Sequence, residues 1–191
     1  SLLSAPQNAA PRPQWGFWAC PRMVPLHSGG RQGSPGSQDK VLRMCEPLPD
    51  TYKALWAEAV GESFRAVASL KEMPMQLPNE GQVLIKVKYA GINGGCETFR
   101  ARGEAGFARN KEAVGGFGLG AEGSGTVVRV GGGVEGLAPG DDVAFLSVTG
   151  GFAEYAVARE GSCIRVPEAN GEAAALRISG LTAYAPLDTG G

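Results

Sequence analysis

The sequence predicts a mainly β protein, folded as a small and partly open β-barrel with short helices. Between residues 52 and 166, short runs rich in β-branched and aromatic residues alternate with glycine-rich turns, a pattern typical of barrels. After Asn170 the apolar residues recur at roughly helical spacing, which predicts a helix near the end of the chain. The globular part is therefore expected from about Met44 onward.

The clearest strand is predicted at residues 82–92, where every second residue is apolar and most of the others are polar, as in a half-buried strand. The apolar set is Val83, Ile85, Val87 and Tyr89. Before it, two strands are expected to meet around Gly61, followed by a proline-containing loop over residues 70–80. In chain order, strands are predicted at 52–60, 64–70, 82–92, 123–131, 142–148, 151–158 and 163–166.

Two segments favour helical structure. Residues 93–103 predict one or two helical turns with Phe99 as their apolar residue, and Gly103 would end them. Residues 170–187 predict a helix, with Asn170 as its N-cap.

The first 43 residues carry scattered prolines and show no sustained period of 2 or 3.6, so they are expected to be disordered. Their basic residues and near lack of acids are weakly similar to an organellar transit peptide; the alternative is sequence upstream of a true start at Met44. The predicted organisation is an extension at 1–43, a barrel at 44–170 and a helix at 171–191.

Composition excludes several classes of function. With 18 basic and 19 acidic residues, no strong field favours nucleic acid or an anionic membrane, and no apolar run is long enough to span a bilayer. The one histidine, His27, argues against a histidine base. The cysteines form no metal-spaced pair, which favours reduced thiols in an intracellular protein, cytoplasmic or organellar: Cys20, Cys45, Cys96 and Cys163.

A glycine cluster over residues 115–125 invites comparison with phosphate-binding loops. The dinucleotide fingerprint, however, opens a helix, whereas these glycines precede a predicted strand. Residues 115–120 are too rich in glycine for either regular element. The favoured interpretation is tight turns and close backbone approach within a barrel.

One family pattern covers the chain from about Tyr52 to Gly191. Its blocks are Gly-Ala-Glu-Gly-Ser-Gly-Thr-Val-Val-Arg-Val-Gly at 120–131, Gly-Asp-Asp-Val at 140–143, Gly-Ile-Asn at 91–93, Gly-Phe-Ala-Glu-Tyr at 151–155 and Ser-Gly-Leu-Thr-Ala-Tyr at 179–184. In this order they resemble the N-terminal, GroES-like domain of the medium-chain dehydrogenase/reductase superfamily. The similarity is greatest to its zinc-free branch, which includes quinone oxidoreductases and prostaglandin reductases.

The resemblance argues against a zinc-dependent alcohol dehydrogenase. In that branch a thiolate stands where this chain has Asn93, and an imidazole stands where it has Ala121. Catalytic zinc takes three protein ligands, and Glu122 alone does not make a site. The four-cysteine lobe of the structural zinc is also absent from this sequence, so no metal is expected.

The resemblance implies hydride transfer from NADPH to an enone or quinone, with the cofactor carrying the chemistry. Asn93 is the candidate catalytic residue and would also lie beside the nicotinamide. Cys96 and Phe99 are candidate substrate contacts, although each is also explained as a packed apolar residue. Thr182 is a candidate cofactor contact or ordinary helix packing. Glu122 and Glu154 are expected to be structural.

In this family a strand, a glycine turn and a helix that bind the pyrophosphate should follow soon after Gly191. We therefore expect a fragment of an NADPH-dependent reductase, inactive by itself and a possible homodimer in the longer protein. The alternative is a catalytically silent barrel that serves as a binding or interaction module. An apolar face is expected to be exposed at Ala183, Tyr184 and Leu187.

Overall fold

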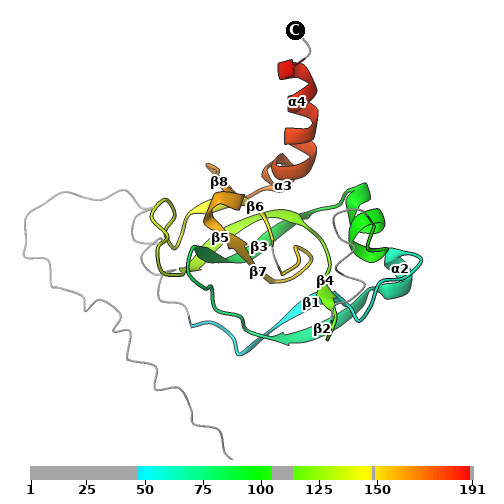
Figure 1. Ribbon diagram of the computed structural model, residues 1–191. Coiled ribbons are helices and arrows are strands. Elements are labelled where there is room, and N and C mark those ends of the chain that lie inside the picture. Colours follow the sequence, from blue (N-terminus) through cyan, green and yellow to red (C-terminus); the bar gives the residue numbers. More distant parts are fainter. Residues whose placement is uncertain (1–46, 105–113, 148, 190–191) are drawn as a thin grey trace, which may run out of the picture. The chain divides into compact units, whose positions relative to one another are not determined.

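The computed structural model describes residues 47–104, 114–147 and 149–189, arranged as strands with short helical segments between them (Figure 1). Two of these segments, η1 and η4, are π-helical turns. In chain order the elements are β1 (Thr51–Ala57), α2 (Phe64–Val67), β2 (Ser69–Pro74), β3 (Gln82–Gly91), η1 (Cys96–Ala101), β4 (Phe117–Gly118), β5 (Glu122–Val130), β6 (Asp142–Leu146), β7 (Tyr155–Arg159), η3 (Glu160–Ser162), β8 (Cys163–Arg165), α3 (Gly171–Ala174), η4 (Leu176–Gly180) and α4 (Leu181–Thr189).

The strands form two antiparallel sheets. One has the order β7-β3-β5-β6-β8 and curls around its own inner face, and the other has the order β2-β1-β4 (Figure 1). Residues 152–154 join the sheets, because Leu55 N–H donates to Phe152 O at 2.8 Å and Val87 N–H donates to Glu154 O at 2.9 Å. Among the described residues β7 does not pair with β8. The predicted mainly β, partly open architecture is thus confirmed.

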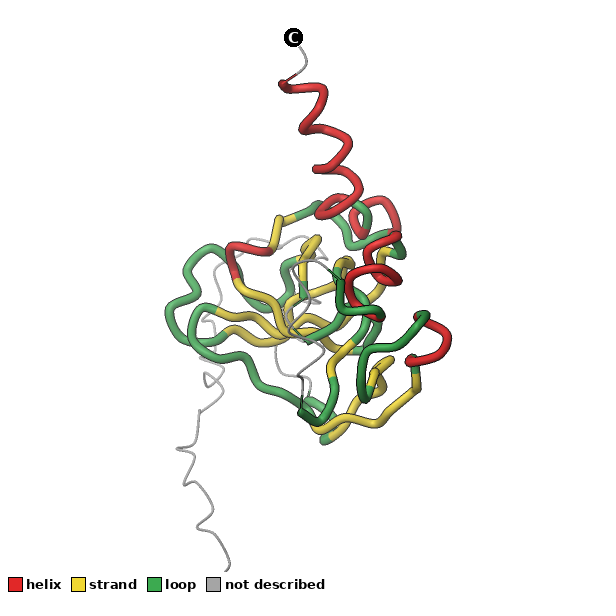
Figure 2. Tube along the Cα trace, turned by 45° about the vertical axis from the view of Figure 1, so that its right-hand side comes forward, coloured by secondary structure: helices red, strands yellow, loops and turns green. Residues whose placement is uncertain are grey.

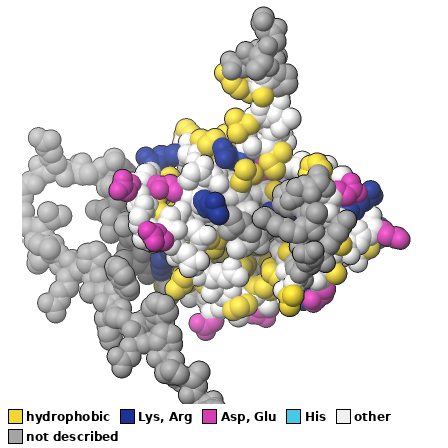
Figure 3. All heavy atoms as spheres, in the orientation of Figure 1, with side chains coloured by type: hydrophobic (Ala, Val, Ile, Leu, Met, Phe, Trp, Pro, Cys, Tyr) yellow, Lys and Arg dark blue, Asp and Glu magenta, His cyan; other side chains and the backbone are white. Residues whose placement is uncertain are grey.

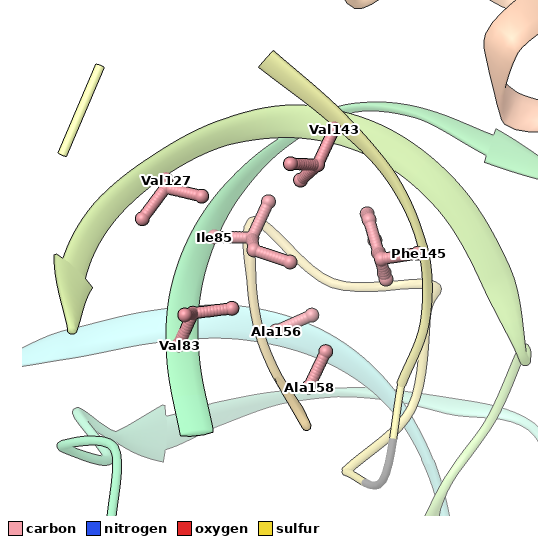
Figure 4. Close-up of a cluster of buried hydrophobic side chains, with 7 residues drawn as sticks. All are labelled: Val83, Ile85, Val127, Val143, Phe145, Ala156 and Ala158. Carbon is pink, nitrogen blue, oxygen red and sulfur yellow. The ribbon is translucent and has the colours of Figure 1, made fainter. Parts of the chain in front are cut away.

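The main core lies inside the curl of the larger sheet. Seven side chains from β3, β5, β6 and β7 point toward one another there (Figure 4). All are at most 1% exposed: Val83, Ile85, Val127, Val143, Phe145, Ala156 and Ala158. This apolar burial supplies the main driving force that holds the four strands in a curve.

Strand β3 departs from the simple alternation predicted for it. Leu84 is 1% exposed although it was assigned to the more polar face, and Tyr89 is 50% exposed although it was assigned to the apolar one. The pairing of β3 with β5 shifts register between Leu84 and Ile85 and again between Val87 and Tyr89. The second irregularity leaves Lys88 as an extra residue in β3 and so changes the side to which Tyr89 points. Leu84 does lie on the face opposite Val83 and Ile85, but that face is buried at this point, where Leu84 pairs with the buried Val157.

The predictions for residues 64–74 are largely wrong, whereas residues 75–80 form a loop as expected. The expected strand at 64–70 begins as the helical turn α2, which Ser63 caps by accepting a hydrogen bond from Ala66 N–H at 3.2 Å. The expected loop at 70–80 instead begins within strand β2, which pairs with β1 along its length. Pro74 is tolerated because β2 is an edge strand and the proline ends it.

The other strand predictions agree with the structure to within a few residues, except that β7 begins later than expected, at Tyr155. Residues 115–120 are not wholly irregular, since two of them form β4. The interpretation of the glycine cluster is confirmed. Gly120 has a φ of +76°, and a Cβ on Gly125 would lie 2.3 Å from Lys86 O on the neighbouring strand.

The predicted C-terminal helix is broken into α3, η4 and α4. Asn170 is its N-cap as expected, since Oδ1 accepts from Ala173 N–H at 2.8 Å. In Figure 2 the helical segments lie around the margins of the strands. Ala183 and Tyr184 are exposed as predicted, and the side chain of Leu187 lies outside the described residues. Within the described ranges, no helix has the length and apolarity needed to cross a membrane.

The predicted extension, Met44, His27, Cys20 and Cys45 lie outside the described residues. The domain boundaries therefore stay predictions. On the face seen in Figure 3, basic and acidic side chains are interspersed, and hydrophobic side chains gather at the base of the C-terminal helix. Leu176, Leu181 and Tyr184, from this part of the chain, are each more than 40% exposed.

Asp142 connects the larger sheet to the segment that leads into α3. Its carboxylate accepts from Thr126 Oγ1 at 2.6 Å and from Ala169 N–H at 3.0 Å, and Lys88 Nζ lies 3.5 Å away. Burial alone would raise the pKa of Asp142. The two hydrogen bonds and the lysine outweigh burial and lower the pKa below 3.8.

A lowered pKa in the folded state means that ionised Asp142 stabilises the fold above its unfolded pKa, and that this contribution is lost as pH falls through the folded pKa. We expect the Asp142→Asn variant to be less stable at neutral pH but to lose less stability than the wild type between about pH 5 and pH 2. Urea unfolding across that range measures this. An equally steep loss in both proteins would contradict the assignment.

Candidate functional site

Two cavities open beside the turn that follows β3. The smaller, about 440 Å³, lies between the 93–95 turn with η1 and the η4–α4 segment. The larger, about 820 Å³, lies between β1, the end of β3 and residues 151–154. They share one lining residue, Asn93.

The smaller cavity is lined by polar groups from segments far apart in sequence. Asn93 and the backbone of Gly94 and Gly95 form one side, and Ser179 and Thr182 form the other. Convergence of a few polar groups on an otherwise apolar concavity is typical of ligand sites. We refer to this cavity below as the Asn93 cavity.

Asn93 is held firmly although it is only partly buried. Its Oδ1 accepts from Gly95 N–H at 3.0 Å, an Asx turn that starts η1, and lies 3.9 Å from the Cys96 thiol. Its Nδ2 donates to Glu122 Oε1 at 3.1 Å. The side chain is thus bonded through both ends of its amide.

Glu122, the first residue of β5, is 1% exposed. Its second oxygen, Oε2, accepts from Ile178 N–H of η4 at 2.6 Å. The side chain fits because residue 91 on the neighbouring strand is glycine: a Cβ there would lie 2.6 Å from Glu122 Cγ. One buried carboxylate therefore contacts both sides of the Asn93 cavity.

The structure brings three of the four candidate residues to one cavity. Phe99, 41% exposed, and the exposed Thr182 line it together with Asn93. Cys96 does not: its side chain is 4% exposed and borders the larger cavity. Glu154 accepts from Lys53 N–H at 2.8 Å, on the rim of the larger cavity.

Sequence reasoning missed Arg100 and Ser179, which also line the Asn93 cavity. The Arg100 guanidinium donates to Gly118 O and Ser147 O, each at 3.4 Å, so it fastens η1 to the barrel. The helical turns predicted for residues 93–103 contain Arg100 next to the candidate Phe99, so this segment could have suggested Arg100 as well. No local pattern could have indicated its carbonyl partners 18 and 47 residues away.

The larger cavity is less suited to chemistry. Most of its lining is apolar, and Phe64 and Phe152 pack edge to face there with ring centroids 5.8 Å apart. Its two acids, Glu97 and Glu154, already accept hydrogen bonds from the backbone, at 2.6 Å from Phe64 N–H and at 2.8 Å from Lys53 N–H. We therefore assign the candidate site to the Asn93 cavity.

No group of three or more His, Cys, Asp or Glu side chains in the described part of the chain could hold a metal. Ala121 lines the Asn93 cavity but offers no ligand atom. The expectation of a zinc-free site stays a prediction. For a nicotinamide cofactor the fit is better, because amide and hydroxyl groups at Asn93, Ser179 and Thr182 can bond a neutral carboxamide.

Comparison with known proteins finds a matching domain family and named relatives. Residues 79–168 match the alcohol dehydrogenase GroES-like domain. A Leishmania amazonensis protein named "Probable quinone oxidoreductase" is 36% identical over 141 residues, covering 73% of this chain and 39% of that protein. Mouse prostaglandin reductase-3 is 28% identical over 143 residues, covering 74% and 36%.

A mycobacterial structure complexed with NADPH is also similar, with a TM-score of 0.62 and 28% identity, covering 72% of this chain and 41% of that one. The match of residues 79–168 and the similarity to these relatives agree with the expected N-terminal GroES-like domain of the medium-chain dehydrogenase/reductase superfamily. It spans less than half the length of these relatives.

The close approach of Gly91 to Glu122 predicts a strong effect of a single methyl group. Gly91→Ala should displace the buried Glu122 side chain and lower the free energy of unfolding by about 1–3 kcal/mol, the usual cost of overpacking. Gly161→Ala is the matched control, since nothing lies within 4 Å of a Cβ there. Urea unfolding compares them, and equal stabilities would contradict the crowding at Gly91.

Proposed function

We propose that this chain is the barrel domain of an NADPH-dependent reductase that transfers hydride to an enone or a quinone. The observation that carries the proposal is the Asn93 cavity, where an amide donor and two hydroxyl groups converge. The named relatives, a quinone oxidoreductase and a prostaglandin reductase, support the same chemistry. Because the chain covers only part of those relatives, the activity of a longer protein is itself part of the proposal.

In this proposal Asn93 binds the substrate oxygen. One Nδ2–H is used by Glu122, and the second has no hydrogen-bond partner among the described residues. An N–H at the wall of a cavity can donate to a carbonyl oxygen, on which negative charge develops during reduction. Phe99, on the same wall, offers an apolar surface for the ring or chain of the substrate.

Bound NADPH would supply the hydride, so the protein needs neither a nucleophile nor a metal for the transfer. Ser179 and Thr182 are the residues proposed to bind the nicotinamide carboxamide, with Asn93 beside them. These groups hold one end of a large cofactor. We therefore expect this chain alone to bind NADPH with a Kd weaker than about 1 mM. A micromolar Kd would contradict the proposal that this chain holds only one end of the cofactor.

Asn93→Ala provides the test of substrate contact. Titration of the ¹⁵N-labelled chain with 2-cyclohexenone should shift the amide resonances of Gly94, Gly95 and Ser179. The variant should bind the enone about 3- to 10-fold more weakly, the effect of one lost hydrogen bond. Asn79→Ala, at an exposed turn before β3, should bind like the wild type.

Shifts confined to residues that line the larger cavity, such as Leu55 and Phe152, would contradict the assignment of the site. Equal enone affinity in Asn93→Ala and wild type would contradict the role of Asn93 alone.

A further inference from the structure

Glu122 divides its two oxygens between two distant parts of the chain. Oε1 accepts from Asn93, 29 residues earlier, and Oε2 accepts from Ile178, 56 residues later. Asn93 belongs to the turn before η1, and Ile178 belongs to η4. Both residues line the Asn93 cavity, whereas Glu122 itself does not. The carboxylate therefore lies behind the cavity and holds its two sides together.

The partners of Asn93 determine which way its amide faces. Gly95 N–H needs an acceptor, so it selects Oδ1, and the Glu122 carboxylate needs a donor, so it selects Nδ2. A flipped amide would set N–H against N–H at Gly95 and oxygen against oxygen at Glu122. Both contacts would then be repulsive, and only one orientation is compatible with the site.

Burial makes it energetically costly for Glu122 to lose either hydrogen bond. Glu122 is 1% exposed, so an oxygen that loses its partner has little access to water in exchange. The side chain also packs closely against Gly91, since a Cβ there would lie 2.6 Å from Glu122 Cγ. Glu122 is thus held in place by packing as well as by hydrogen bonds.

We propose that Glu122 is a positioning residue that acts through Asn93, fixing the amide so that the cavity presents an N–H donor and no amide acceptor. The inference deepens the proposed function and rests on it for the identity of the ligand. With Asn93 fixed in this way, the cavity selects ligands whose oxygen accepts a hydrogen bond, such as ketones and quinones. It disfavours ligands that must also donate one, such as the corresponding alcohols.

Glu122→Gln is the informative variant, and Glu160→Gln is its matched control. At position 122 each oxygen accepts one bond, so glutamine must place its NH₂ group against either Asn93 or Ile178. At position 160 one oxygen, Oε1, accepts from both Glu135 N–H and Gly136 N–H, so glutamine can keep both bonds. The two changes remove the same charge, but only the first should disturb the cavity.

Hydrogen exchange in the ¹⁵N-labelled chain reports on the positioning directly, with Asn93→Asp used to assign the side-chain amide. In the wild type, one Asn93 Nδ2 proton and the Ile178 backbone N–H should be protected. In Glu122→Gln at least one of the two should exchange about 10-fold faster or more, and in Glu160→Gln neither should change. Unprotected protons at both positions in the wild type would overturn the proposal, even if Glu122→Gln fails to fold.

A second readout separates positioning from general loosening. The ratio of affinities for 2-cyclohexenone and 2-cyclohexenol should favour the ketone in the wild type and in Glu160→Gln, and should fall toward one in Glu122→Gln. Equal weakening for both ligands, with the ratio unchanged, would overturn the positioning role. If exchange behaves as expected but neither ligand perturbs the cavity, the orientation of Asn93 stands and the proposed function fails.

Discussion

A buried carboxylate between two walls is the interaction on which the site depends. Glu122 accepts one hydrogen bond from Asn93 and one from Ile178, and these residues come from turns that no strand pairing joins. Net hydrogen bonds to charged groups are worth about 1.5–3 kcal/mol each, a large share of a typical folding free energy. Without Glu122 the η4–α4 segment would lose the hydrogen bond from Ile178 N–H that links it, through the carboxylate, to the Asn93 turn.

The barrel serves this connection by placing β5 between β3 and β6. Gly91 at the end of β3 pairs with Glu122 at the start of β5, and the absence of a side chain on Gly91 makes room for the carboxylate. The seven-residue core within the same strands (Figure 4) holds that register. Packing in the larger sheet thus fixes the start of β5, and with it the position of Glu122 beside the cavity.

Much of the fold could be predicted from sequence, since residues 82–92 alternate, residues 123–131 form a β-rich run that begins with glycines, and Asn170 is an ordinary N-cap. The failures have physical causes. Residues 64–67 became a helical turn because Ser63 caps them and because Glu97, 33 residues away, accepts from Phe64 N–H. Tyr89 is exposed because a bulge, which alternation cannot reveal, intervenes in β3.

The candidate site, like the fold, could be predicted only in part. Family motifs marked Asn93, Phe99 and Thr182, and the structure brings all three to one cavity. Cys96 follows Asn93 by three residues, yet its side chain faces the other cavity because η1 turns it away from the first. Glu122 was expected to be structural. Its link between two walls could not be predicted, because it depends on partners that only the folded chain brings together.

The most direct test of this account is a crystal structure of the chain soaked with 2-cyclohexenone. We predict the enone oxygen at about 3 Å from Asn93 Nδ2, with Asn93 Oδ1 still accepting from Gly95 N–H and Glu122 still bonded to Ile178. Enone bound in the larger cavity, or an Asn93 amide turned so that its oxygen faces the ligand, would contradict it.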